Sequence, residues 1–147
     1  MSRTTLLALA SRVEAAAGAD RELDCLIWAE QNGEQITWQG NCMVAGVHGV
    51  VGWIDPGVTQ RNFSTNRATT GPASIPAYTA SLDAARTLVP SGLILRNYQS
   101  SRFVPHSCEV ALSWAHGGWL GNSDHSFALA LTAACLRALA VLEQDNG

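Results

Sequence analysis

The chain has 147 residues, of which 47% are hydrophobic and 14% are charged, and its formal net charge is −3. A chain of this size can build a hydrophobic core, and this composition argues against disorder. The small negative charge argues against a protein that coats nucleic-acid polymers.

Two helices are predicted at the start of the chain. Apolar residues at three- and four-residue spacing predict the first over residues 4–17, and Gly18 ends it. Asp20 is a suitable N-cap for the second, which ends at the Asn-Gly pair 32–33. After it, residues 34–54 are rich in Val, Ile and Trp with glycine punctuation, and they predict two or three short strands.

A polar loop is predicted over residues 59–76, where prolines keep the chain extended. Thr79 or Ser81 then caps a third helix, which Pro90 and Gly92 end.

The rest of the chain predicts two strands and a last helix. The strands are expected at 93–98 and 108–114, and in the second of them alternate residues from Cys108 to Trp114 share one face. Residues 116–122 resemble a glycine-rich turn, and the last helix is expected to start near Ser123 or Ser126. These elements in the order ααβββαββα predict one α+β domain over residues 1–147, with a mainly antiparallel sheet layered with helices as in an α/β/α sandwich.

Nothing in the sequence predicts secretion or a membrane segment. The first apolar run is interrupted by Arg12 and Glu14, and the longest one, near the C-terminus, contains Arg137. The cysteines form no CxxC pair, so reduced, buried thiols in a cytoplasmic protein are expected.

Three segments, in this order, resemble the phage "ABA sandwich" family of small tailed-phage and prophage proteins: GADRELDCLIWAEQNG, IPAYTASLDAARTLVPSG and ALALTAACLRALAVLE. The match covers roughly a third of the chain, and residues 31–75 depart from it. The resemblance implies a phage origin, hence a bacterial host, and a three-layer fold. It supplies no catalytic residue, because the family has no well-established activity.

The stretch RNFSTNRATTG, residues 61–71, holds two arginines and no acid. Arg61 and Arg67 are candidates for gripping a phosphate with paired donors, and Phe63 is a candidate for stacking on a base. The alternative is a solvated loop with no ligand. A loop of this length in a compact domain is often functional or disordered.

A second group of candidates follows at the start of the third predicted helix. Tyr78 could stack on a base, and Thr79, Ser81 and Asp83 could bind ribose or base edges at a helix start that accepts an anion. The alternative is that the polar residues cap the helix and the tyrosine packs against the sheet.

Catalytic motifs are missing from the sequence. No HExxH, CxxC or GxSxG motif is present, so neither a metal site nor a cofactor is predicted. An enzyme would have to use His106, His116 or His125 as acid and base.

We therefore expect a homo-oligomeric phage protein that sequesters a cyclic nucleotide or an ADP-ribose-type immune signal without catalysis. The model for this expectation is an analogy with phage counter-defence proteins that trap such signals between subunits. Two alternatives stay open: a phosphodiesterase-like enzyme that degrades the signal, and a protein that binds a host or virion protein. Neither a membrane nor a nucleic-acid polymer is an expected partner.

Overall fold

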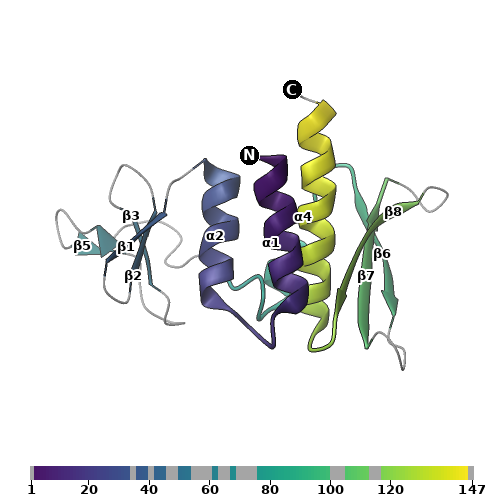
Figure 1. Ribbon diagram of the computed structural model, residues 1–147, viewed down its shortest axis with the longest axis horizontal. Helices are drawn as coiled ribbons and strands as arrows, with labels where there is room; N and C mark the ends of the chain where they lie inside the picture. Colours follow the sequence, from purple (N-terminus) through teal and green to yellow (C-terminus); the bar gives the residue numbers. More distant parts are fainter. Residues whose placement is uncertain are drawn as a thin grey trace. The chain divides into compact units, whose positions relative to one another are not determined.

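The computed structural model describes residues 2–33, 36–39, 42–45, 50–53, 61–62, 67–68, 76–99, 105–112 and 117–145. The described helices and strands, in chain order, are α1 (Arg3–Ala15), α2 (Arg21–Asn32), β1 (Ile36–Gln39), β2 (Cys42–Ala45), β3 (Val50–Trp53), β4 (Arg61–Asn62), β5 (Arg67–Ala68), α3 (Leu82–Arg86), β6 (Ile94–Gln99), β7 (His106–Ala111), β8 (Gly118–Ser123) and α4 (Phe127–Asp145). Figure 1 colours the chain from its N-terminus to its C-terminus and labels most of these elements.

The chain divides into two compact units. Unit 1 combines the two ends of the chain, Met1–Asp20 and Tyr78–Gly147, and unit 2 is the segment Arg21–Ala77 between them. Unit 2 is therefore an insertion into the chain of unit 1. The prediction of a single domain stays untested, because two nested units can share one unfolding transition.

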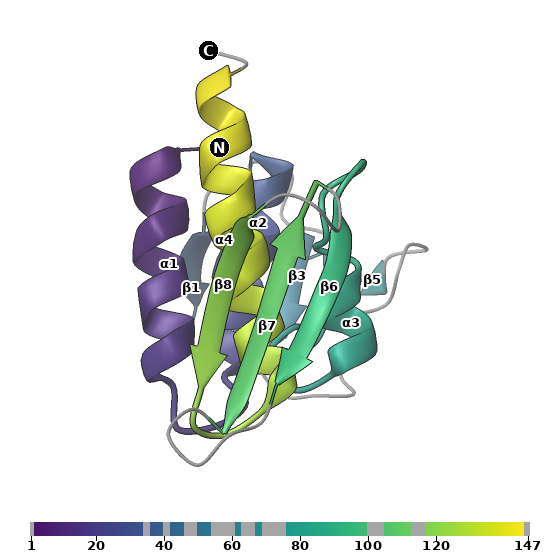
Figure 2. The same cartoon turned by 90° about the vertical axis from the view of Figure 1, so that its right-hand side faces the viewer.

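The predicted α+β class is confirmed. In unit 1, β6, β7 and β8 form an antiparallel sheet in that order, and α4 packs against β7 and β8 with α1 beside it. Figure 2 shows the sheet in front of the helices, with β8 and β7 overlying α4. In unit 2, a second antiparallel sheet joins β1 to β5 in sequence order, and α2 contacts β2.

The first half of helix α4 forms the core of unit 1 because it is almost entirely apolar. All nine residues from Ala128 to Leu136 are at most 5% exposed. Successive helical residues turn by about 100°, so this run of buried residues means that this half of the helix is enclosed on every side. Ser126 starts the helix by accepting a hydrogen bond from Leu129 N at 3.1 Å, as one of the two predicted caps.

By length and composition α4 could also cross a membrane. It is the one such helix among the described residues, and 61% of the window Phe127–Gln144 is buried in the structure. The core helix of a soluble protein passes the same test, so the predicted cytoplasmic location stays a prediction.

Strand β8 comes very close to α4 at Gly121. A Cβ atom at this position would lie 2.5 Å from Ala134 N and still closer to Ala130 O. Such distances leave no room for a side chain, so the absence of one at Gly121 lets the strand backbone rest on the helix backbone. Ala130 and Ala134 of α4, which lie against Gly121, have small side chains that also permit this close contact.

The predicted turn at 116–122 is wrong, since most of it is strand β8. Its glycines indicated a turn, but Gly121 is required by packing within a strand. A related error concerns Leu112, which was expected to share a face with Cys108 and Val110, the two residues that the structure buries. Strand β7 ends at Ala111, the alternation stops there, and Leu112 is 60% exposed.

We predict that Gly121→Ala destabilises the protein by about 3 kcal/mol or more, since the methyl group forces β8 away from α4. Urea unfolding followed by circular dichroism measures the loss. Gly117→Ala is the matched control, because nothing lies within 4 Å of a Cβ atom there. Equal stability of the two variants would contradict the close approach.

Candidate functional site

The predicted arginine stretch lies in unit 2. Two short strands pair within the predicted loop, with Arg61 opposite Ala68 and Asn62 opposite Arg67. Successive positions in a strand belong to opposite faces, so Arg67 shares a face with Asn62, and Arg61 falls on the other face. Phe63, the predicted stacking residue, lies outside the described residues.

Tyr78 and Thr79 are both buried, at 3% and 1% exposure. The Thr79 hydroxyl accepts a hydrogen bond from Asp20 N at 2.8 Å and donates one to Asp20 O at 3.1 Å. The Tyr78 carbonyl accepts from the hydroxyl of Thr132, a fully buried residue of α4, at 3.1 Å. These bonds hold together the two places where the chain leaves unit 1 and returns to it.

The same two chain segments are joined on the unit 2 side. Arg21 donates to the carbonyl of Pro76 at 3.1 Å and forms an ion pair with Asp24 at 3.3 Å. Arg21 and Asp24 have side chains only 12% and 2% exposed. The entry and the exit of unit 2 are thus tied together on both sides of the unit boundary.

We predict that Thr79→Val, which keeps the shape but loses the hydroxyl, costs about 1–3 kcal/mol, because Asp20 N is left without this acceptor. Amide hydrogen exchange measures the local effect, and we expect the Asp20 amide to exchange faster. Thr79→Ser keeps the hydroxyl and should keep the protection. Slow exchange of Asp20 in Thr79→Val would count against this role for the hydroxyl.

Ser81 and Asp83 belong to the start of α3. Ser81 Oγ accepts from Ala84 N at 3.2 Å, so the predicted capping role is confirmed for Ser81 and not for Thr79. Asp83 is exposed in the first turn of α3, where its negative carboxylate interacts favourably with the positive end of the helix dipole. Helix α3 has five residues, so its dipole is small and its start is a weak anion site.

Arg96 and Glu109 form an ion pair between β6 and β7 that the sequence reasoning missed. Arg96 donates through Nε to Glu109 Oε2 at 3.3 Å and through Nη2 to Oε1, which also accepts from Gly118 N at 3.0 Å. The strand register shifts between Leu95 and Asn97, so Arg96 is the extra residue of a β-bulge. Opposite charges on neighbouring predicted strands were the available signal.

The described histidines are not part of a metal-binding cluster. Among the described residues, no group of three His, Cys, Asp or Glu side chains could hold a metal ion. His106 Nδ1 lies 3.1 Å from Ser123 O, and its ring packs edge-on against Phe127 at 4.8 Å between centroids. His125 is exposed, and His116 lies outside the described residues.

Cys108 and Cys135 are buried thiols in the core around α4. Burial raises the pKa of each to about 12 from the usual 9.0, and for Cys135 the nearby Cys108 adds to the effect. A thiol held neutral in this way is a poor nucleophile. Both cysteines therefore act as small apolar core residues, as Cys25 does by its burial in α2.

We predict that Cys108 and Cys135 do not react with a thiol reagent in the native protein at pH 8. Mass spectrometry of digests locates the modified residues, and the denatured chain is the control in which both react. Between pH 9 and 12 the unfolded chain ionises while the folded one does not, so stability should fall by about 1.4 kcal/mol per thiol for each pH unit. Fast native labelling would contradict the burial.

None of the family models, curated proteins and solved structures compared with this chain matches it. The resemblance to the phage "ABA sandwich" family therefore stays a prediction.

Proposed function

We propose that this protein sequesters an anionic nucleotide, of the cyclic or ADP-ribose type, and that unit 2 provides the binding surface. The observation that carries the proposal is the charge pattern of one segment. Between Asp55 and Asp83 the chain has two arginines and no acidic residue, in a protein that is negative overall. A segment of this kind attracts anions.

The paired strands β4 and β5 support the proposal. They bring the positions of Asn62 and Arg67 opposite each other, and Arg61 is the residue that precedes Asn62 in β4. A guanidinium group supplies paired donors for a phosphate, and an amide supplies a donor and an acceptor for a base edge. Because the two arginine positions fall on opposite faces, we assign them to different phosphate groups.

The polar groups of unit 1 argue for a scaffold role. Thr79 joins two chain segments, Ser81 caps α3, and Glu109 holds Arg96 and the Gly118 amide. These bonds stabilise the fold and leave no catalytic arrangement among the described residues. We therefore propose binding without turnover, with Thr79 and Ser81 as structural residues. In a phage, such a protein would remove an immune signal from the bacterial cytoplasm, and two copies would build the pocket together.

We predict that one compound raises the melting temperature by several degrees in a panel of cyclic di- and trinucleotides and cyclic ADP-ribose isomers. The purified protein is then heat-denatured, and the released compound is examined by HPLC. Recovery of intact compound supports sequestration, and recovery of a converted product supports the enzyme alternative. No shift and no loss across the panel would overturn both and would favour a protein partner.

Arg67→Ala should weaken binding of that compound by about ten-fold or more, because a hydrogen-bonded charge is lost. Arg86→Ala is the matched control, since it removes one arginine from an exposed position in α3. Equal affinity of these two variants would remove the arginine stretch from the site.

A further inference from the structure

The outer edge of β8 is covered by two side chains in place of a neighbouring strand. Among the described strands, only β7 pairs with β8, and it does so on one side (Figure 2). On its other side, Asn122 N donates to Glu14 Oε2 at 2.9 Å, and Leu120 O accepts from Arg137 Nη1 at 2.7 Å. Glu14 Oε1 also pairs with Arg137 Nη2.

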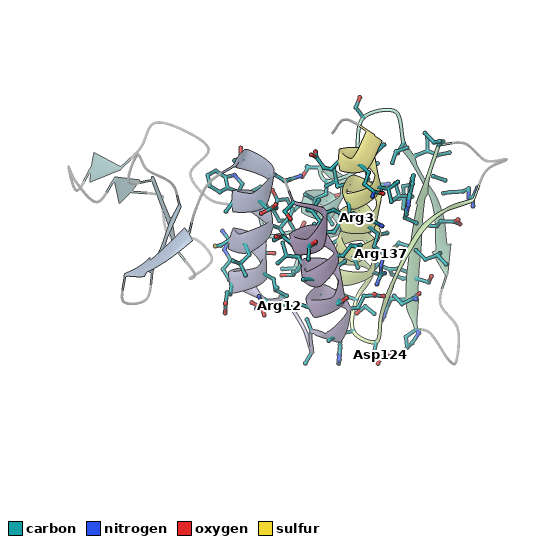
Figure 3. The ribbon with its side chains drawn as sticks, turned by 45° about the horizontal axis from the view of Figure 1, so that its top comes forward. Arg3, Arg12, Asp124 and Arg137 are labelled. Carbon is teal, nitrogen blue, oxygen red and sulfur yellow. The ribbon has the colours of Figure 1, made fainter. Side chains whose placement is uncertain are left out.

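Glu14 and Arg137 supply the hydrogen-bond acceptor and donor that a neighbouring strand would supply. Backbone groups of residues two apart in a strand point to the same side, so Leu120 and Asn122 present their N–H and C=O groups outward together. Glu14 supplies an acceptor and Arg137 a donor at the spacing of a ladder. The two side chains come from α1 and α4, and Figure 3 labels Arg137 on α4.

The two edges of the sheet are protected in different ways. On β6 the bulge at Arg96 interrupts the ladder, which is a feature of the backbone itself. On β8 the protection is an ion pair whose Arg137 and Glu14 side chains are 30% and 21% exposed. The pair is therefore partly accessible to water and to ions, which screen an accessible ion pair more than a buried one.

We propose that the Glu14–Arg137 pair is a removable cap on β8 and that, once it is removed, two copies of this chain join edge to edge through β8. An antiparallel pair with its two-fold axis at Gly121 sets Leu120 of one copy opposite Asn122 of the other. Both copies then satisfy the same outward N–H and C=O groups that the cap holds. Leu120, which is 50% exposed, would gain burial in this pair. The inference does not rest on nucleotide binding.

The test is the molar mass of Glu14→Ala/Arg137→Ala, measured by light scattering after size exclusion over a range of concentrations. The matched control is Asp83→Ala/Arg86→Ala, which removes one acid and one arginine from exposed positions on α3. We expect the mass of the uncapped variant to become twice that of the wild type, at concentrations where the control variant does not change. An uncapped variant that is folded and keeps the wild-type mass would overturn the proposal.

Adding Asn122→Pro to the uncapped variant locates the contact. Proline removes the outward N–H of residue 122 and leaves the β7 side of the ladder untouched. We expect the wild-type mass to return, and association that persists in this variant would overturn the proposal. If the double variant does not fold, the single variant Glu14→Ala replaces it, because alanine removes the acceptor of Asn122 N and the partner of Arg137. An unchanged mass of a folded Glu14→Ala would likewise overturn the proposal.

Discussion

The contact of the β8 backbone with the α4 backbone at Gly121 is the constraint on which unit 1 depends. It sets how near the sheet lies to the helix, and the alanines of α4 are compatible with that distance. The rest of the core follows from this approach, because Cys108 and Val110 of β7 are buried on the same face of the sheet. A larger residue on either side would separate the layers, and interiors packed at native density do not tolerate such a gap.

Where the sheet and the helices of unit 1 meet solvent, polar groups need hydrogen-bond or ion-pair partners of their own. The cap by Glu14 and Arg137 and the Arg96–Glu109 pair at the bulge supply such partners, and the buried Thr79 hydroxyl does the same between two chain segments. Each of these groups bonds to the backbone or to an opposite charge. A buried or edge-strand polar group without a partner costs free energy, so these bonds are part of what stabilises the fold. The same bonds explain why we assign the proposed ligand to the inserted unit 2.

The insertion of unit 2 separates two tasks along the chain. Unit 1 consists of the two ends of the chain. A hydrogen bond between Asp20 and Thr79 joins the point where the chain leaves unit 1 to the point where it returns. A segment inserted at such a point can vary in sequence without disturbing the core. The stretch from Arg61 to Arg67 carries the two arginines that we propose for the ligand.

The sequence by itself determined the elements whose signals are local. Helical spacing predicted α1, α2 and α4, Ser81 was one of the two caps predicted for α3, and Gly33, with φ of +66°, ends α2 as the Asn-Gly pair predicted. The tertiary structure alone decided the features that depend on partners far away in the chain. Gly121 resembled a turn residue until α4 was seen against it, and Glu14 gave no sign of Arg137, which lies 123 residues later. The physical reason is that capping and periodicity act over a few residues, whereas close packing and edge protection depend on which segments the folded chain brings together.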